Sequence, residues 1–375
     1  MGKREKVLII TQYSMPAFKR NMNAYQRIFH GAEHADVALL MRHRQTASEE
    51  IQERVSVHHA PVENRLLFLV YAVLFAGYQR LRGRAIVFTD PSGFALAGFF
   101  AKYLFGCFWV LDLWDRPRWR TGHHQEGMRP PFADRLVFWA MRHADLFILS
   151  VLPRAVKDID PPASRCVQFV NAIDLSLSAE HPPQRHHGEQ TLHAAYGRSE
   201  FHETMGMEVV IRAVELLMQR GCPVHIHTVG EMSTEALARI QASESRAQFT
   251  HHGVIAGPRA LLFRTVHVGL VPYLPFEDLS YIFPIKVVEH LSQGNPVIAS
   301  DLPGLAATIQ DEYNGLLVTP GDPTALADAL ERLQKNVDLW QSMAENALAS
   351  SRRYDSGDKN AGIYTAVLQR FRERR

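Results

Sequence analysis

The chain has 375 residues, of which 46% are apolar and 21% are charged, and its formal charge at neutral pH is +2. This length favours two domains over one, and the small net charge gives no support for nucleic acid as a partner. The three cysteines, Cys107, Cys166 and Cys222, are odd in number and widely spaced. They exclude a disulfide framework and predict a cytoplasmic protein with reduced thiols.

The apolar segments are too short to cross a bilayer. The longest, Leu66 to Tyr78, has about thirteen residues, against the ~20 that a spanning helix needs. Val7 to Ile10 is the only apolar run near the amino terminus, which predicts no secretory signal. Leu66 to Tyr78 and the basic, aromatic run Arg116 to Arg120 leave two interpretations open. In the first interpretation, Leu66 to Tyr78 is a core helix and Arg116 to Arg120 is a loop that binds the acceptor. In the second, both segments make a peripheral contact at the inner face of a membrane.

Short apolar runs alternate with longer helical patterns over residues 1–180. Val7–Ile10 has the continuous apolar character of a strand buried on both faces, as in the centre of a parallel sheet. The alternation predicts a doubly wound α/β domain. Further strands are predicted at Val37–Met41, Arg84–Thr89, Phe108–Leu113, Leu146–Ser150 and Val167–Val170, and helices at Asn64–Leu81, Gly93–Phe105 and Phe132–His143.

A second domain of the same class is predicted after a break. Residues 181–190 contain no apolar residue besides prolines and have no periodicity, which indicates a linker. The alternation of strands and helices restarts over residues 191–355, for example with a helix at Met207–Met218 and a strand at Val224–Val229. Residues 356–375 are expected to form a helix that can pack back on the first domain. Two such domains predict a ligand bound between them.

The segment from Pro284 to Gly294 has the clearest chemical meaning. Pro284 suits the first turn of a helix, and Gly294 suits the left-handed residue beyond its end. Free N–H groups at the start of this helix would attract a diphosphate. Lys286 in the first turn indicates a nearby anion, because a cation there opposes the helix dipole. Glu289 follows on the same face and can accept hydrogen bonds from ribose hydroxyls.

Three fragments of the second half together resemble the donor-site signature of glycosyltransferase family 4. Pro284–Glu289 resembles its donor-site helix, and Gly294–Ser300 resembles the strand that follows. Tyr313–Val318 with Pro320–Pro323 resembles the next loop and strand. The resemblance implies the GT-B fold, with two facing Rossmann-like domains. It also implies a retaining reaction without an essential metal or cofactor, in which a UDP- or GDP-linked sugar is the donor substrate.

Weaker matches extend the resemblance and assign candidate residues. Tyr196-Gly197-Arg198 resembles the family's glycine-arginine turn, and Leu111–Asp115 resembles a strand end that faces the acceptor. By this resemblance, the predicted donor-binding residues are Gly197, Arg198, Gly230, Tyr281, Phe283, Pro284, Ile285, Lys286 and Glu289; the predicted acceptor-binding residues are Asp112, Asp115, Arg118 and Trp119; and the predicted catalytic residues are Asp115, Arg198, Lys286 and Glu289.

The chain departs from the family pattern at two donor-site positions. Tyr281 stands where the family usually has a glutamate that touches the donor sugar, and Met205 stands where a lysine is expected after the arginine. In the predicted reaction, Arg198 and Lys286 stabilise the negative charge that grows on the departing diphosphate. Lys286 is therefore the candidate to supply the missing cation.

The sequence predicts a hexosyltransferase that acts on a saccharide or lipid-linked acceptor in cell-surface polysaccharide or glycolipid synthesis. Two alternatives stay open. A nucleotide-sugar epimerase would need acid and base carboxylates that the sequence does not reveal. A non-catalytic scaffold that binds a partner glycosyltransferase is favoured by Tyr281 and Met205. Adjacent histidines such as His251-His252 point to opposite faces of a strand, and no zinc-site spacing occurs, so no metal site is predicted.

Overall fold

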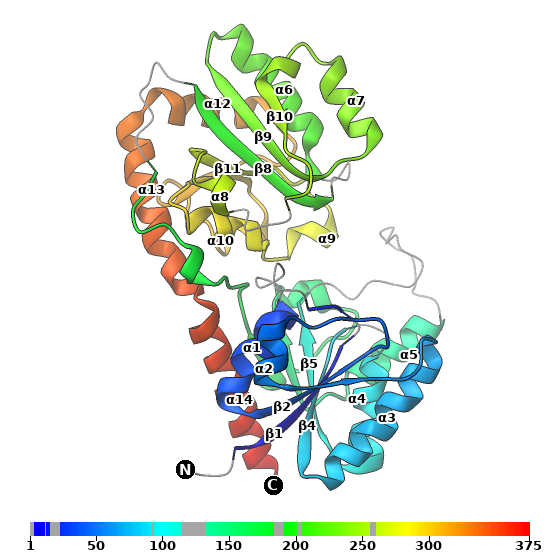
Figure 1. Cartoon of the computed structure of the whole chain (residues 1–375). Coiled ribbons are helices and arrows are strands. Elements are labelled where there is room, and N and C mark those ends of the chain that lie inside the picture. Colours follow the sequence, from blue (N-terminus) through cyan, green and yellow to red (C-terminus); the bar gives the residue numbers. More distant parts are fainter. Residues whose placement is uncertain are drawn as a thin grey trace. The chain divides into compact units, whose positions relative to one another are not determined.

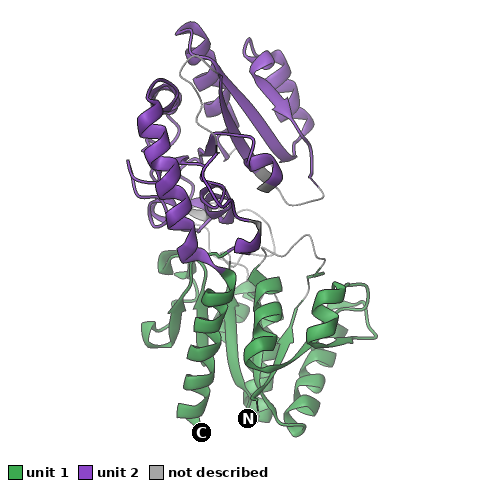
Figure 2. Cartoon of the chain, turned by 60° about the vertical axis from the view of Figure 1, so that its left-hand side comes forward, with its two compact units in different colours: residues 1–172, 356–375 green, residues 173–355 purple. Residues whose placement is uncertain are grey.

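The computed structural model describes residues 4–11, 13–15, 23–91, 94–114, 132–183, 191–200, 205–255 and 260–375 (Figure 1). Within these ranges, the side chains of residues 133, 177, 198–200, 260, 277 and 278 are not described. The chain forms two compact units, residues 1–172 with 356–375 and residues 173–355 (Figure 2). Each unit contains one parallel sheet with helices, so the predicted α/β class is confirmed.

Among the described residues, the first unit has a seven-stranded parallel sheet in the order β3-β2-β1-β4-β5-β6-β7. Val7 and Ile9 of the central strand β1 face the core under α1 and α14, whereas Leu8 and Ile10 face the core under α3 and α4. Residues Val7 to Ile10 of this strand are all apolar because helices cover both faces of the sheet. The strands are β1 (Lys6–Ile10), β2 (Asp36–Met41), β3 (Ser56–His59), β4 (Arg84–Thr89), β5 (Phe108–Leu113), β6 (Leu146–Leu149) and β7 (Cys166–Gln168), and the helices are α1 (Asn23–His34), α2 (Glu49–Arg54), α3 (Arg65–Leu81), α4 (Ala95–Phe105), α5 (Phe132–Met141) and α14 (Ser356–Arg374).

The described part of the second unit has a six-stranded parallel sheet in the order β10-β9-β8-β11-β12-β13. Its main core lies between this sheet and the helices α6, α12 and α13, with Trp340 and Leu330 fully buried. The strands are β8 (Leu192–Glu200), β9 (Val224–Glu231), β10 (Phe249–His251), β11 (Val268–Val271), β12 (Val297–Ser300) and β13 (Gly315–Val318), and the helices are α6 (Met207–Gln219), α7 (Thr234–Ala242), α8 (Ala260–Phe263), α9 (Glu277–Ser280), α10 (Ile285–Leu291), α11 (Pro303–Ala306), α12 (Pro323–Lys335) and α13 (Val337–Ser351).

The last helix, α14, belongs to the first unit and packs closely against α1. Gly31 makes this approach feasible, because a Cβ atom there would lie 2.1 Å from the hydroxyl oxygen of Tyr364. The Tyr364 hydroxyl donates a hydrogen bond to the carbonyl oxygen of Arg27 (2.8 Å). Burial raises the pKa of Tyr364 far above its usual value, which keeps the hydroxyl protonated as a donor.

The boundary between the units differs from the predicted one. The first unit ends at Ala172 rather than at residue 180. The next residues contact the second unit, because the N–H of Ala179 donates to the carbonyl oxygen of Ser292 (3.0 Å). Pro182 packs against Gly294, where a Cβ atom would lie 2.8 Å from the Pro182 Cα. Residues 184–190 of the predicted linker lie outside the described residues.

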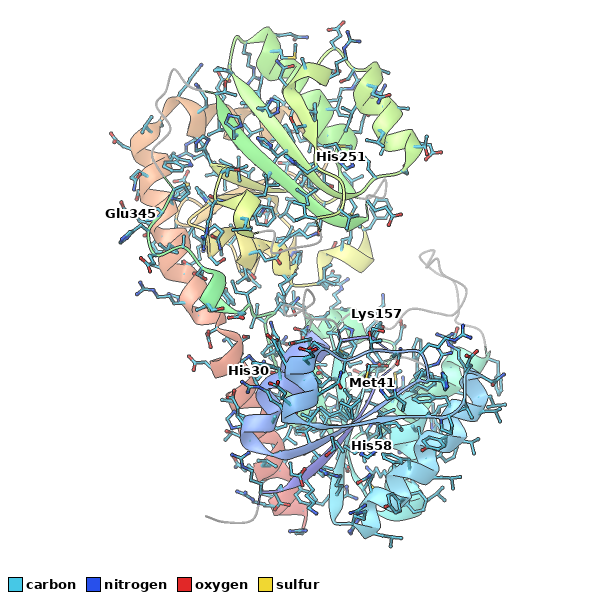
Figure 3. All side chains as sticks on the ribbon, viewed as in Figure 1. His30, Met41, His58, Lys157, His251 and Glu345 are labelled. Atoms are coloured by element: carbon cyan, nitrogen blue, oxygen red, sulfur yellow. The ribbon has the colours of Figure 1, made fainter. Side chains whose placement is uncertain are left out.

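The elements that the sequence analysis did not predict include the strand β3 and the helix α13. The edge strand β3 has exposed to half-buried residues and no apolar run, and the ring of its His58, labelled in Figure 3, lies 5.0 Å from the ring of Phe75 in α3. The helix α13 has a clear signal that was overlooked, since its buried residues Trp340, Met343 and Ala347 recur at helical spacing. None of the described helices combines the length and apolar character that a membrane crossing requires.

Candidate functional site

The order in which the chain adds strands to the second sheet reverses between β8 and β11. These strands are neighbours, but the chain continues from β8 to β9 on one side and from β11 to β12 on the other. In open parallel sheets, ligands bind beyond the carboxyl ends of the two strands at such a switch point. Gly197 lies near the carboxyl end of β8, and α10 follows β11 in the chain. The topology therefore brings the predicted donor residues from both parts of the sequence to one edge of the sheet.

The connections after β8 and β11 meet at Gly206. This residue is the N-cap of α6 and has a left-handed backbone with φ of 81°. A Cβ atom at Gly206 would lie 1.9 Å from the carbonyl oxygen of Pro272, which directly follows β11. Only glycine combines this φ with so close an approach of two backbones. The sequence analysis missed Gly206; its place just before the Met207 helix was the available signal.

The predicted donor-site helix is present, with one correction at its start. Helix α10 begins at Ile285, and Pro284 is its N-cap with φ of −68° and ψ of 121°, not a residue of its first turn. With this extended ψ, Pro284 is the last residue of the loop that connects the short helix α9 to α10. Gly294 has φ of 75°, so its predicted left-handed backbone beyond the helix end is confirmed.

The two charged residues of α10 are both buried. The exposed fraction is 7% for Lys286 and 8% for Glu289, and their spacing of three residues puts them on one side of the helix. Lysine and glutamate are rarely buried, because removing a charge from water is costly. A buried cation and carboxylate beside the switch point form the strongest candidate for a charged-ligand site among the described residues.

Helix α10 is held rigidly against the sheet by a second glycine. A Cβ atom on Gly269 in β11 would lie 2.4 Å from the Cγ of His290, so the helix packs directly on this strand. The ring of His290 also lies 4.0 Å from the ring of Phe263, and the Asn295 side chain donates to the Phe263 carbonyl oxygen (2.6 Å). These contacts fix the backbone that carries Lys286.

The loop before α10 is fixed by Gly304 of α11. A Cβ atom there would lie 2.1 Å from the carbonyl oxygen of Ile282, so any other residue would displace the loop. Tyr281 is half-buried at the end of α9, and Ile285 is half-buried at the start of α10. Phe283 is buried, which leaves its backbone as the part that can contact a ligand. The donor roles of these three residues remain predictions.

The predicted glycine-arginine turn is a strand in the structure. Strand β8 continues through Gly197 and Arg198 to Glu200, because it pairs with the long strand β9 as far as Glu231. A Cβ atom on Gly197 would lie 3.2 Å from the ring of Phe263. Arg198 therefore lies at the carboxyl end of the strand before the switch point, while its side chain is outside the described atoms.

Met205, at the position of the expected lysine, is a core residue. Its exposed fraction is 4%, and it belongs to the main core of the second unit. The hydroxyl of Tyr196, which is fully buried, donates a hydrogen bond to the Met205 carbonyl oxygen. This contact ties β8 to the start of α6. The side chain of Met205 supplies no charge to a donor.

Gly230 has a conformation that favours glycine, as expected for a residue close to a ligand or another backbone. Its φ is 130°, and its N–H donates to the carbonyl oxygen of Gly253 (2.8 Å). It lies near the carboxyl end of β9, the strand next to β8. The structure thus explains the glycine by backbone geometry, and its donor contact remains a prediction.

Asp112 has a structural partner inside the first unit, which differs from the predicted acceptor contact. Its Oδ2 accepts a hydrogen bond from the Arg27 Nε (2.8 Å), and its exposed fraction is 3%. The Arg27 guanidinium also donates to the Asn360 Oδ1 on α14 (2.5 Å). Burial raises the pKa of Asp112, and Arg27 opposes this shift. The side chain is inaccessible because the helices α1 and α14 cover it.

The other acceptor candidates lie outside the described residues. Asp115, Arg118 and Trp119 belong to residues 115–131, which follow β5 directly. Strand β5, which precedes this segment in the chain, ends at Leu113 on the carboxyl edge of the first sheet, the usual ligand-binding edge of such folds. Their acceptor roles, and the catalytic role of Asp115, remain predictions.

Histidines form a hydrogen-bonded row across the second sheet. The Nδ1 of His193 lies 2.8 Å from the Nε2 of His227, whose Nδ1 lies 3.0 Å from the Nε2 of His252. Burial, followed by the neighbouring histidines, lowers the pKa of His227 to about 4. His251, labelled in Figure 3, points to the opposite face and contacts the Oγ1 of Thr228 (3.0 Å). In the described part of the chain, no three His, Cys, Asp or Glu residues are arranged to hold a metal ion.

Comparison with known proteins identifies the class of the second unit. Residues 193–336 match the family model "Glycosyl transferases group 1". This range lies within the second unit and contains every predicted donor residue, from Gly197 to Glu289. The chain therefore carries a group 1 glycosyltransferase domain, and the resemblance seen in its motifs is confirmed.

Curated proteins that are similar to part of the chain include glycosyltransferases. The phosphatidyl-myo-inositol mannosyltransferase of Mycobacterium leprae (strain TN) is 34% identical over 152 residues, which are 40% of this chain and 39% of the relative. The alpha-D-kanosaminyltransferase of Streptomyces kanamyceticus is 29% identical over 170 residues, which are 43% of this chain and 42% of the relative. The chain thus covers only 39% and 42% of the length of these two relatives.

Solved structures match nearly the whole chain in fold. The sucrose-phosphate synthase of Thermosynechococcus elongatus has a TM-score of 0.74 at 17% identity, covering 99% of this chain and 100% of that chain. HepE of Anabaena, solved in complex with UDP and glucose, has a TM-score of 0.73 at 17% identity and covers 97% of this chain and 100% of that chain. The predicted GT-B fold, with two Rossmann-like units, is confirmed.

Proposed function

We propose that the protein is a retaining glycosyltransferase that moves a hexose-type sugar from a nucleotide sugar to a saccharide or lipid-linked acceptor. The observation that carries this proposal is the buried pair Lys286 and Glu289 on α10, next to the switch point of the second sheet. The group 1 match includes this helix. The UDP in the HepE structure supports a nucleotide as the ligand class.

In this proposal, the second unit binds a UDP- or GDP-linked donor. Glu289 accepts hydrogen bonds from the ribose hydroxyls, and Arg198 and Lys286 contact the diphosphate. As the bond between sugar and phosphate breaks, negative charge grows on the diphosphate. The two cations stabilise that charge more in the transition state than in the bound donor, which lowers the barrier. A metal is not part of this scheme, and activity that persists in EDTA would support that prediction.

The first unit binds the acceptor in this proposal. Asp115 orients the acceptor hydroxyl, with Arg118 and Trp119 close to it in the chain. Asp112 is left out of this site because it is buried against Arg27. The setting that we propose is cytoplasmic synthesis of cell-surface polysaccharide or glycolipid. A lipid-linked acceptor would bring the protein to the inner face of the membrane.

Thermal unfolding with UDP, GDP and ADP tests the donor site. We expect one of the three nucleotides to raise the melting temperature, because a ligand that binds only the folded state stabilises it. The Glu289→Gln variant should lose most of this shift, since the ribose contact is weakened. Glu345→Gln, an exposed glutamate on α13 of the same unit, is the matched control and should keep the shift. Equal shifts in both variants would contradict the ribose role of Glu289.

Product analysis tests the chemistry. With the nucleotide sugar whose nucleotide binds, we expect release of that nucleotide and an anomeric configuration in the product that equals that of the donor. An NMR measurement of the new glycosidic bond distinguishes retention from inversion.

A non-catalytic scaffold is the second candidate, favoured by the burial of Met205 where the family has a lysine. A scaffold would bind nucleotide without releasing it from a nucleotide sugar. Single-turnover hydrolysis of the donor therefore separates the two functions, because only the enzyme breaks the bond between sugar and phosphate.

A further inference from the structure

The first unit exposes apolar side chains along one side of α3. Six of them, Leu66, Leu67, Val70, Leu74, Tyr78 and Leu81, are between 51% and 89% exposed. At about 100° per residue, they fall within an arc of about 120° on the helix surface. The buried side chains of α3, such as Phe68 and Ala72, lie on the opposite side and pack on the sheet.

This pattern contradicts the interpretation of the segment Leu66 to Tyr78 as a core helix. Other parts of the protein would cover a core helix on both sides. Helix α3 is apolar on both sides, but only the side that packs on the sheet is covered. Side chains project outward from α3 in the view of Figure 3, where the helix can be found by its place in Figure 1. Single exposed apolar residues are common in proteins, but a continuous exposed stripe indicates an interaction surface.

The neighbouring helices α4 and α5 extend the stripe into a broad face. Phe100, Tyr103 and Leu104 are exposed on α4. Their spacing places them on one side of that helix, away from Ala95 and Gly98, which are buried. Helices α3 and α4 pack closely against each other, because a Cβ atom on Gly77 of α3 would lie 2.6 Å from the ring of Phe105 of α4. The exposed side chains of α4 therefore continue the stripe of α3.

Helix α5 forms the other edge of the face, with Phe132, Leu136 and Trp139 exposed at helical spacing. The ring of Phe99 on α4 lies 5.4 Å from that of Trp139 and 4.8 Å from that of Tyr103. The three helices therefore lie side by side on one side of the sheet (Figure 1). We call the exposed apolar side chains of α3, α4 and α5 the apolar face.

The exposed charges on the helices that carry the apolar face are positive. In α3 and α4 there is no Asp or Glu, and the one acidic residue of α5, Asp134, is buried. The exposed charges on α3 and α5 are arginines, including Arg65, Arg80 and Arg135. Glu63 precedes α3 and forms an ion pair with Arg44 (2.7 Å).

The basic rim continues at the end of α3. Arg82 follows the helix, is exposed, and donates a hydrogen bond to the Tyr78 hydroxyl (2.8 Å). Arg80 lines a hollow of about 110 Å³ together with Arg374 and Arg375 at the chain's end. Arg374 is paired with Asp145 (2.6 Å) and Arg375 with Glu5 (3.8 Å), and the charged residues that line the hollow are arginines. An apolar face with a cationic rim is the pattern of proteins that bind anionic membrane surfaces.

We infer that the apolar face of α3, α4 and α5 docks on the surface of an anionic bilayer. The leucines, phenylalanines and Trp139 enter the boundary between headgroups and acyl chains, and the arginines contact lipid phosphates. The described helices lie on such a surface without crossing it, since none of them has the properties of a spanning helix. Only the biological purpose of this docking rests on the proposed function, because docking would bring the enzyme to a lipid-linked acceptor.

Co-sedimentation of the full chain with lipid vesicles tests the inference. We expect retention on vesicles of phosphatidylglycerol and phosphatidylcholine, little retention on phosphatidylcholine alone, and release at high salt. The variant Leu74→Glu/Leu104→Glu should bind the anionic vesicles about tenfold more weakly or worse, because it places two charges in the apolar face. Both side chains are more than 60% exposed, so the fold should tolerate the change.

Two further variants separate the apolar and electrostatic parts. Met218→Glu removes an exposed apolar residue of α6 in the second unit and is the matched control, which should bind vesicles like the parent. Arg80→Gln/Arg82→Gln should lose about fivefold in binding per arginine on anionic vesicles. The melting temperature and its nucleotide shift should stay unchanged in all three variants.

Several results would overturn the inference. They are no retention of the parent on anionic vesicles, equal retention on neutral vesicles, or equal loss of binding in Met218→Glu. A parent chain that sediments as a dimer and becomes a monomer in Leu74→Glu/Leu104→Glu would show that a second copy covers the face instead. The proposed donor site fails separately, through the absence of any nucleotide shift in the parent.

Discussion

Each of the two units buries a cation and a carboxylate, but at different places. In the first unit, Arg27 and Asp112 are joined at 2.8 Å, and Asn360 holds the arginine from α14. In the second unit, Lys286 and Glu289 lie one turn apart on α10, after the strand at the switch point. The first pair joins a helix to the sheet, and the second pair lies where such folds bind ligands. Burial of charge alone therefore does not mark a functional site.

Breaking the pair in the first unit should have the largest effect on stability. Asp112→Asn leaves the Arg27 charge buried without its carboxylate, which should cost about 3–5 kcal/mol in the free energy of unfolding. The double variant Arg27→Met/Asp112→Leu should recover much of that loss, because no charge is then buried. Urea unfolding measures both. A loss of nucleotide binding in a stable Asp112→Asn protein would contradict the structural role.

The close approach at Gly206 should be the next most sensitive point, this time in the second unit. Gly206→Ala forces both a left-handed alanine and a clash with Pro272, and should destabilise the unit by at least ~2 kcal/mol. Gly221→Ala is the matched control, because its φ is 66° and nothing lies near its Cβ position. That control should cost about 1 kcal/mol from backbone strain alone.

Nucleotide affinity separates the two variants further. Gly206→Ala should also weaken binding of the nucleotide in calorimetry, because it moves the connection beside the switch point. Gly221→Ala lies at the other end of α6 and should bind normally. Equal binding by the two variants would show that the donor does not reach the Gly206 connection.

The charge of Lys286 should matter for the diphosphate and little for the nucleoside. Lys286→Met should weaken binding of the nucleoside diphosphate by about tenfold, or ~1.4 kcal/mol, through loss of one charged contact. Affinity for the corresponding nucleoside should change little. Lys335→Met, an exposed residue paired with Glu331, controls for the loss of one positive charge. Calorimetric titration would contradict the assignment if both ligands lost affinity equally.

The histidine row should make the stability of the second unit depend on pH. The pKa of His227 is lowered by burial from 6.5 to about 4 in the folded state. Between these pH values the unfolded chain binds more protons, so stability is lost as the pH falls from 6.5 towards 4. His227→Gln should reduce this loss in urea unfolding, whereas His59→Gln in the edge strand β3 should not. An unchanged pH dependence in His227→Gln would contradict the effect.

The sequence by itself determined the fold class and predicted the helix on which we propose the donor site. Buried parallel strands need continuous apolar runs, and Arg84–Thr89 and Phe108–Leu113 were predicted with the observed bounds. The helix after Pro284 and the left-handed backbone of Gly294 could be predicted from the sequence, because helix ends depend mainly on neighbouring residues. The predicted helix start was off by one residue, since a proline can serve as N-cap or as first helical residue.

Only the tertiary structure decided which charges are structural and which surfaces are open. Asn360 and Arg27 are separated by 333 positions, and no local pattern signals such a contact. The glycine at position 206 became meaningful when Pro272 was found against it. Periodicity showed that α3 is apolar, but it could not show that one side remains uncovered. Local patterns report what a segment can bury, and only the packing of distant segments determines what is buried.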